Sequence, residues 1–597
     1  VIRRYQMRGK VPFDPHIIIK KGWMIMTELF SSASSMWLLF GTVLIFFMQA
    51  GFAMLECGFG RSKNAGNIVM KNLLDFTIGT CVFWLLGFGI MFGKGNGFFG
   101  WLDLTSSLDY SHILPAGIPF SAFFIFQTVF CATSATIVSG AMAERTKFES
   151  YCILCAVIAL IAYPVTGHWI WGGGWLSSLG FQDFAGSSAV HLAGGTAALI
   201  GALVLGPRIG KYDSKGNSKA MPGHNLPLAA LGIFILWMGW FGFCGASTKS
   251  MEGTQIQTAA SIFVNVNLSA AFSTCTVMLI TRARYGKSDI SMTINGALAG
   301  LVISTGCCAY IEPVGAALIG ILAGALLVPS LELVDKKLHI DDPVGAVSVH
   351  GVMGFVGTLL TGLLSLDTGL FYGGGFRQLG IQLLGAVSVI AWTALVISLT
   401  LLLLKNTLGI RVSAKEEIAG LDMAAHGLVS AYPDFAVSTL ITSGILSDYK
   451  ESILPDNADK PVSLEAAVPV DYAVSPDSNP LPKVEIIMKQ ERFEALKNAL
   501  NEVGVTGMTV TQVFGCGIQK GQQEFYRGTE MDMQLLPKIR VEIVLAKVPV
   551  NDVVNAARRV LYTGHIGDGK IFISHMDNAV KIRTGEQGYD AMQGNDE

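Results

Sequence analysis

The chain has 597 residues, of which 51% are hydrophobic and only 14% are charged. Because soluble domains carry about 25% charged residues, an ordinary soluble protein is excluded, and the formal net charge of −2 does not indicate nucleic-acid binding. The apolar character is concentrated in residues 36–404, whereas residues 405–597 have a soluble-protein composition. The ten cysteines follow no metal-site or disulfide spacing.

Residues 1–35 are interpreted as an N-terminal extension. Its basic side chains are Arg3, Arg4, Arg8, Lys10, Lys20 and Lys21. These charges disagree with the membrane orientation derived below, and Met26 offers an alternative start, so one expectation is that residues 1–25 are not native. The extension contains no apolar run of the signal-peptide type.

Residues 36–404 contain repeated apolar runs of about 20 residues, the length that one membrane-crossing helix needs. Eleven spans are predicted, near residues 36–56, 73–93, 119–140, 151–167, 187–205, 226–247, 258–280, 291–308, 313–329, 344–364 and 378–404. The loops after the odd-numbered spans carry fourteen Lys and Arg residues, against three in the opposite loops. The positive-inside rule therefore places the N-terminus outside and the C-terminal region in the cytoplasm.

Two histidines lie inside the fifth and tenth predicted spans, where an ionisable side chain is costly and usually functional. His191 follows Asp183 by eight residues, and His350 follows Asp342 by eight. Spans 1–5 and 6–10 enter the membrane from opposite sides, which is typical of an inverted repeat with its site near the midplane. We therefore expect the two imidazoles to meet and to exchange hydrogen bonds with a small, weakly basic solute. The alternative is that each is a core histidine with one satisfied hydrogen bond.

Aromatic side chains flank this candidate pathway. They are Phe126, Phe130, Trp171, Trp240 and Phe243, and the hydroxyl of Ser247 lies nearby in sequence. Aromatic faces attract a desolvated cation by roughly 0.5–2 kcal/mol. The alternative is the ordinary interfacial belt of aromatic residues, and composition alone does not separate the two interpretations.

Residues 36–433 carry motifs that resemble the Amt/Mep/Rh ammonium transporter family. The motifs are Gln49–Ala53, Arg61–Asn64, Met70–Asn72, Phe126-Gln127, Gly140–Arg145, Trp171–Gly174, Asp183–Gly186, Trp240–Phe243, Asn295–Gly300, Asp342-Pro343 and His350-Gly351. The resemblance implies a homotrimer in the bacterial cytoplasmic membrane with one pore per subunit. It also implies that Phe126, Trp171 and Ser247 recruit ammonium from outside, supported by Asp183. Phe130 and Phe243 would then form a gate above the pore pair His191 and His350.

The region behind the last span divides into a tail and a linker. Residues 405–433 resemble the family's cytoplasmic regulatory tail, although Leu428 stands where an acidic residue is usual. Residues 434–482 contain six prolines and are interpreted as a flexible linker.

Residues 483–597 alternate strand and helix patterns. Strands are predicted at 484–487, from 508 and at 541–545, and helices at 491–503 and 550–562. This order predicts an α+β, ferredoxin-like βαβ–βαβ duplication, a fold that by itself indicates little about function. Two glycine-rich turns that carry lysine, at 515–521 and 563–570, could cradle phosphate.

These turns, with Tyr526–Gly528, Leu536–Lys538 and Arg583–Glu586, resemble the PII signal protein. The resemblance implies an ATP or ADP site at trimer clefts, made by Thr509, Gly517, Gly567, Gly569, Lys570, Lys581 and Arg583. It implies that Gln519 and Lys538 bind 2-oxoglutarate, with magnesium held near Gln519 through ATP and not by a protein cage. Residues 518–535, with Tyr526 and Arg527, would form the effector loop.

Two departures from the PII pattern narrow its implied regulation. Met531 occupies the position that is often uridylylated, so covalent regulation is not expected. Lys581 replaces a phosphate-binding arginine, which keeps the charge but loses the bidentate fork.

The two resemblances together imply an ammonium transporter regulated in cis by its own PII domain, with lipid, further copies of the chain and separate PII proteins as candidate partners. A rival interpretation is an ammonium sensor with little net transport that signals through the PII domain. A nucleotide-processing enzyme is the weakest alternative, because the sequence shows no general base together with metal-binding carboxylates.

Overall fold

The computed structural model describes residues 30–427, 481–489, 492–515, 524–526, 529–531, 536–562 and 568–592. The chain divides into a helical unit and a sheet unit, which we describe separately. Most of the expected N-terminal extension and of the predicted linker lies outside the described residues.

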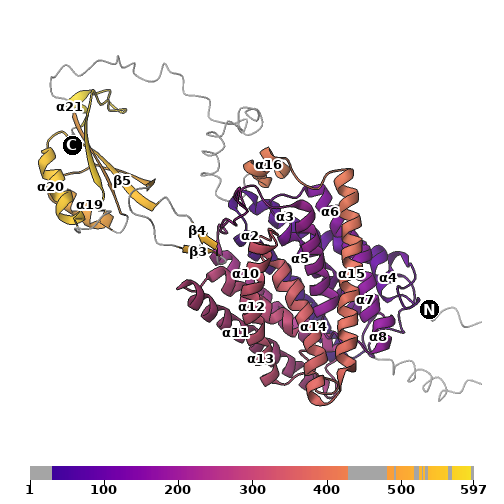
Figure 1. Cartoon of the computed structure of the whole chain (residues 1–597). Helices are drawn as coiled ribbons and strands as arrows, with labels where there is room; N and C mark the ends of the chain where they lie inside the picture. The colour runs from indigo at the N-terminus through magenta and orange to yellow at the C-terminus, as the bar shows by residue number, and fades with distance from the viewer. Residues whose placement is uncertain are drawn as a thin grey trace, which may run out of the picture. The chain divides into compact units, whose positions relative to one another are not determined.

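The helical unit is a bundle of long helices (Figure 1). Its first half contains α2 (Ser32–Phe59), α3 (Ala65–Val82), η3 (Phe83–Gly87), α4 (Phe88–Phe92), α5 (Phe120–Ala141), α6 (Phe148–Val157), η5 (Ile158–Ala162), α7 (Tyr163–Ile170), α8 (Trp175–Leu179), η6 (Ser187–Leu192) and α9 (Ala193–Leu205). Its second half contains α10 (Leu226–Gly245), α11 (Gln255–Tyr285), α12 (Ile290–Ser304), α13 (Pro313–Glu332), η8 (Leu333–Lys337), η9 (Val347–Val352), α14 (Met353–Leu364) and α15 (Phe376–Asn406). Two short tail helices follow, α16 (Ala414–Ala419) and α17 (Leu421–His426).

Ten helices among the described residues are long and apolar enough to cross a membrane. The predicted span 291–308 corresponds to α12, which has only 15 residues. At 1.5 Å per residue such a helix is about 22 Å long, shorter than the roughly 30 Å hydrocarbon core of a bilayer. Turns at residues 305–310 extend its path, and the eleventh span stays a prediction.

The outer surface of the bundle carries large apolar side chains, whose exposure to water would be unfavourable. On α15, Leu395, Leu399 and Leu403 are 54%, 61% and 65% exposed. They recur every four residues and therefore share one helix face. A continuous exposed leucine face on a 31-residue helix is the arrangement expected of a helix that contacts lipid.

The sheet unit has four antiparallel strands in the order β2-β5-β1-β6. The strands are β1 (Leu481–Met488), β2 (Thr509–Gly515), β5 (Leu536–Val544) and β6 (Lys570–Met576). Helices α19 (Phe493–Glu502) and α20 (Val550–Leu561) connect them, and the short helix α21 (Gly588–Ala591) follows. A separate two-stranded sheet pairs β3 (Glu524–Tyr526) with β4 (Thr529–Met531).

Alternating apolar residues explain the core of the sheet unit. Val484, Ile486 and Met488 are fully buried, and they alternate along β1 as one face of a strand must. The amphipathic helices α19 and α20 cover this core with Leu496, Leu500 and Val553. The predicted helices and the strands predicted at 484–487 and from 508 are confirmed to within three residues, whereas β5 begins five residues before the predicted 541. Strand β6 was not predicted from the sequence, and most of its side chains are exposed.

Candidate functional site

His191 and His350 lie in two helical segments, η6 with α9 and η9 with α14, and each segment begins with its own aspartate cap. We call these two segments half-helices. The Asp183 carboxylate accepts three backbone N–H bonds at 2.8–3.0 Å, from Gly186, Ser188 and Ala189. The Asp342 carboxylate accepts backbone N–H bonds from Gly345 at 2.9 Å and from Val347 at 2.7 Å. A carboxylate here satisfies orphan helix donors and favours the positive end of the helix dipole. The repeated interval of eight residues is therefore the separation, in each half-helix, between the capping aspartate and the histidine.

The two half-helices cross without side chains between them. A Cβ on Gly195 would lie 2.1 Å from the Gly351 nitrogen, and one on Gly354 would lie 2.7 Å from the Ser187 carbonyl oxygen. Such contacts would force the backbone apart, so glycine permits the close approach. This crossing brings His191 and His350, which are 159 residues apart in sequence, to the same place.

The two imidazoles face each other in a buried pair. Their Nδ1 atoms are 3.3 Å apart and their ring centroids 5.3 Å apart. An N–H···N bond needs a hydrogen on only one of the two Nδ1 atoms, so the neutral rings must adopt opposite tautomers. The pair therefore presents one Nε2 donor and one Nε2 acceptor to a solute. The His191 Nε2 atom is buried and has no hydrogen-bond partner among the described residues.

Trp240 lies flat against His191. Their ring centroids are 5.0 Å apart with an interplanar angle of 11°, and the Trp240 Nε1 group donates to the Thr305 hydroxyl at 3.0 Å. The indole therefore fixes the plane of the imidazole while its own polar group is satisfied elsewhere. Sequence analysis named Trp240 only as a flanking aromatic residue, since a tryptophan in an apolar run gives no further signal.

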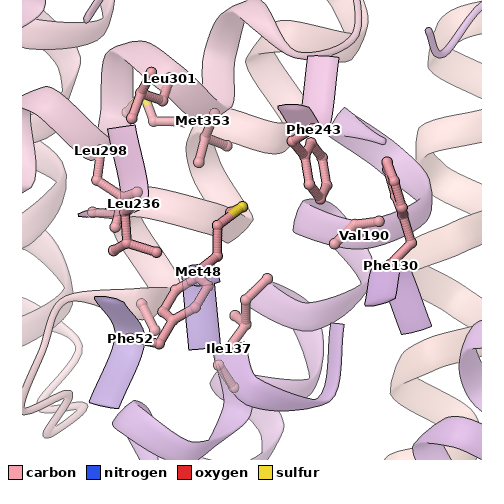
Figure 2. Packing of buried hydrophobic residues seen from close by; sticks show 14 of the residues in the cluster. Met48, Phe52, Phe130, Ile137, Val190, Leu236, Phe243, Leu298, Leu301 and Met353 are labelled. Atoms are coloured by element: carbon pink, nitrogen blue, oxygen red, sulfur yellow. The ribbon is translucent and has the colours of Figure 1, made fainter. Parts of the chain in front are cut away.

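The expected gate residues are stacked. Figure 2 shows the Phe130 and Phe243 rings side by side near Val190, and their centroids are 4.2 Å apart at 24°. Phe126 lies 4.9 Å from Phe130, and Phe243 also lies 5.6 Å from the His191 ring. Both rings are buried and are packed against each other beside His191.

The expected recruitment residues surround the stacked rings. Trp171 packs edge-on against Phe130 at 5.9 Å, and its Nε1 group donates to the Asp183 carbonyl oxygen at 2.8 Å. The Ser247 hydroxyl donates to the Phe243 carbonyl oxygen at 2.8 Å. Because its single hydrogen is used there, its oxygen remains an acceptor for a cationic donor. Asp183 thus positions Trp171 and caps the helix through different atoms.

Ion pairs tie the loops between the helices together on the side of the tail. Glu144 contacts Arg61 at 2.5 Å and Arg208 at 3.2 Å, while Arg208 also contacts Asp341 at 2.8 Å. Burial alone would raise the pKa of Glu144, but Arg208 and Arg61 bring that pKa below its usual value. Burial likewise opposes ionisation of Asp341, yet Arg208 and Arg145 hold its pKa well below the usual range. Both carboxylates are therefore ionised at neutral pH.

The tail contacts two membrane helices, at the end of α9 and at the start of α3. Arg411 pairs with Glu417 at 2.8 Å and donates to the Leu205 carbonyl oxygen at the end of α9. Asp422 accepts from the backbone nitrogens of Gly66 and Asn67 at 3.0 and 2.8 Å, which caps the start of α3. The tail is thereby connected to the helix that carries His191. The predicted Leu428 departure lies outside the described residues.

Only part of the expected nucleotide site is described. Gly569 and Lys570 line one pocket of the sheet unit, together with Arg558 and Asp568. Gly569 has φ +115°, and a Cβ there would lie 2.2 Å from the Ile487 carbonyl oxygen, so the turn requires glycine. Arg558 and Lys570 place two cationic side chains in this lining, which suits a phosphate-bearing ligand, although the Asp568 carboxylate lines the same pocket.

The remaining expected PII residues are not gathered in this pocket. Its lining contains none of Thr509, Lys538, Lys581 and Arg583, and Lys581 pairs with Glu586 at 3.1 Å. Gly517, Gln519, Arg527, Gly567 and most of the effector loop lie outside the described residues, as do the side chains of Tyr526 and Met531. Among the described residues no group of His, Cys, Asp or Glu side chains is arranged to hold a metal ion.

A set of buried ionisable residues on α2 and α3 was not predicted from the sequence. Glu56, Lys71 and Asp75 are at most 2% exposed. Glu56 accepts from Ser139 at 2.8 Å and Asn72 at 3.2 Å, and Asp75 accepts from Tyr151 at 2.6 Å. The signal was available, because Glu56 and Asp75 lie within predicted spans, where ionisable residues are usually functional.

Comparison with known proteins gives consistent matches for both units. Residues 36–431 match the model of the Ammonium Transporter Family, and residues 481–586 match that of the Nitrogen regulatory protein P-II. Ammonium transporter Amt2 of Archaeoglobus fulgidus is 44% identical over 67% of this chain and 88% of its own length. Ammonium transporter 3 of Dictyostelium discoideum is 36% identical over 66% of this chain and 92% of its own length.

Solved structures resemble the helical unit. One described as "Sensor Amt Protein" has a TM-score of 0.63 and 38% identity, covering 66% of this chain and 98% of that protein. Candida albicans Mep2 has a TM-score of 0.60 and 31% identity, covering 66% of this chain and 88% of that protein.

Proposed function

Because the chain belongs to the ammonium transporter family and carries a P-II domain behind its membrane part, we propose that it conducts ammonium through the pore centred on His191 and His350. The observation that supports this is the paired imidazole geometry, with Nδ1 atoms 3.3 Å apart below a stacked phenylalanine gate. Phe126, Trp171 and Ser247 recruit the cation, with Asp183 as their support. One free Nε2 donor and one acceptor suit a small solute that can both give and take a hydrogen bond.

The proposal includes the membrane arrangement. Eleven spans with the N-terminus outside put the tail and the PII domain in the cytoplasm, as the distribution of positive loops favours. The membrane is the bacterial cytoplasmic membrane and the assembly is a homotrimer. Strand order β2-β5-β1-β6 with two connecting helices supports a ferredoxin-like fold for the PII domain.

The PII domain regulates this pore in cis. Gly569 and Lys570 contribute to an ATP or ADP site at a subunit cleft, with Thr509, Gly517, Gly567, Lys581 and Arg583 as its other members. Gln519 and Lys538 bind 2-oxoglutarate together with Mg-ATP. A domain tethered to its own channel acts at a high effective concentration, so the effector loop 518–535 need not compete as a free protein would.

The test measures ammonium currents of the full-length protein in liposomes, with ADP or with Mg-ATP plus 2-oxoglutarate on the cytoplasmic face. We expect the two ligand states to give different currents. Lys570→Ala removes a cationic pocket residue and abolishes the difference, while Lys547→Ala, outside that pocket, preserves it. Conduction that is identical in both ligand states and unchanged by deletion of residues 483–597 contradicts cis regulation.

A second candidate function is ammonium sensing with little net transport. The structural likeness to the protein described as "Sensor Amt Protein" favours it. A sensor would bind ammonium and change the ligand affinity of its PII domain without carrying current. Isothermal titration of ADP with and without ammonium, run beside the current measurement, separates the two functions.

A further inference from the structure

A small cavity lies on the side of His350 that faces α2 and α12. Glu56, Asn295 and His350 supply its polar lining, and Phe52, Ile137 and Leu298 are among its apolar lining residues. Phe52, Ile137 and Leu298 can be followed in Figure 2. The cavity has room for about one water-sized molecule.

The polar side chains that line this cavity offer more hydrogen-bond acceptors than donors. The Asn295 amide nitrogen donates to the Val344 carbonyl oxygen at 3.0 Å, but the Asn295 Oδ1 atom is buried without a hydrogen-bond partner among the described residues. Glu56 adds a carboxylate whose recorded donors, Ser139 and Asn72, both bond to its Oε2 atom. Buried polar atoms in native proteins are normally satisfied, so this lining calls for a molecule that donates a hydrogen bond to the Asn295 Oδ1 atom and can also contact Glu56.

The surrounding charges favour a cation over a neutral donor. The buried set on α2 and α3 contains two carboxylates, Glu56 and Asp75, and a single amine, Lys71. The Lys71 amine lies 5.0 Å from the centre of the Tyr151 ring, and it has no hydrogen-bond partner within the described part of the chain. A buried carboxyl group without a paired charge tends to keep its proton, so the ionised form of Glu56 needs a cation beside it, and a visiting cation can supply that charge.

We propose that Glu56 and Asn295 form a second binding station for the ammonium ion, on the far side of the histidine pair from the phenylalanine gate. This inference rests on the proposed conduction and adds residues that bind the ion after it has passed His350. Ammonium has the size of water and four N–H donors, which matches a one-molecule cavity with a carboxylate oxygen, an amide oxygen and an imidazole in its lining.

The test uses thallium(I), a monovalent cation close to ammonium in size, with crystals of the full-length protein. We expect an anomalous peak between Glu56 and Asn295 in the wild type. Glu56→Gln keeps the shape of the side chain but removes its charge, and it should abolish the peak. Glu56→Asp keeps the carboxylate and should retain the peak at reduced height. Asn295→Leu removes the orphan acceptor and should weaken it.

Ammonium flux into liposomes gives the second readout. We expect Glu56→Gln to lower the maximal flux about tenfold, as the loss of a charged hydrogen-bond partner would, with the half-saturating concentration unchanged because the outer recruitment residues are intact. The matched control is Glu332→Gln, which removes a carboxylate paired with Arg284 and Lys336 at the end of α13 and should conduct like the wild type.

The outcomes separate this inference from the proposed function. A conducting wild type that shows no thallium peak in the cavity overturns the station and leaves conduction standing. A peak in a wild type that does not conduct sinks the transport proposal and keeps the cation site. If Glu56→Gln retains both the peak and the flux, the carboxylate has no role in binding, and the station is wrong.

Discussion

The half-helix that begins at Asp183 and the one that begins at Asp342 have the same backbone design but different neighbours. Each is capped by a carboxylate, starts with a π-helical turn and presents a histidine eight residues later. His191 lies against Trp240 and Phe243, whereas His350 lines a cavity with Glu56 and Asn295. Duplication therefore fixes where the imidazoles stand, and the surrounding helices decide what chemistry each one meets.

Replacing the histidines should give the largest effect. In His350→Ala the His191 imidazole loses the only hydrogen-bond partner that it has among the described residues, at a cost of about 1–3 kcal/mol. We expect ammonium flux to fall up to about 100-fold. His191→Ala should cost less, because His350 still borders the acceptors of the inner cavity. Liposome flux measures both, and His339→Ala, on an exposed loop, is the control. Equal losses of flux in the two variants would show that the different neighbours of His191 and His350 have no effect on conduction.

Removing the caps compares the two backbones directly. Asp183 is buried and accepts from three backbone donors, whereas Asp342 is only partly buried. A lost helix cap costs about 0.5–2 kcal/mol, so Asp183→Ala should lower the melting temperature of the detergent-solubilised protein more than Asp342→Ala. Asp213→Ala, in an exposed turn, should leave it nearly unchanged. A larger loss for Asp342→Ala would mean that burial of the carboxylate does not set cap strength here.

The smallest effect is expected from Trp240. An aromatic pair contributes about 0.5–1.5 kcal/mol beyond area burial, so Trp240→Leu should reduce flux by roughly two- to tenfold as the His191 plane loosens. Trp240→Phe keeps a stacking ring and should lie close to the wild type. Trp84→Leu, on an exposed face of η3, controls for loss of a tryptophan. Full flux in Trp240→Leu would show that the histidine pair holds its own orientation.

Local patterns explain what could be predicted from the sequence. Apolar run length predicts most of the membrane helices, and a histidine in such a run is conspicuous because burial of an ionisable group is costly. The repeated Asp-to-His interval made the pairing of His191 with His350 predictable before any contact was known. The alternation of apolar residues along β1 and the amphipathic periodicity of α20 likewise identified the sheet unit, because both are local patterns.

The rest depends on contacts between distant segments. In the sequence, Trp240 looks like any core aromatic residue, and only the fold shows that it stacks on His191. Likewise, the unpaired oxygen of Asn295 is recognisable only from the fold, in which the amide nitrogen donates to the Val344 carbonyl oxygen. The expected nucleotide residues Thr509 and Arg583 do not join Gly569 and Lys570 in the same pocket. A cleft shared between subunits, as the PII resemblance implies, is beyond what a pattern in one chain can specify.

The glycine crossing has a consequence for timescale. Gly195 rests on the Gly351 backbone and Gly354 on that of Ser187, so neither half-helix can slide past the other without a steric collision. Rocking of packed domains takes microseconds to milliseconds, whereas rotation of single side chains is faster by orders of magnitude. Under the proposed conduction, each passage would then require only the brief displacement of rings such as Phe130 and Phe243. Such permeation would resemble diffusion through a fixed aperture, and its rate should depend little on bilayer stiffness.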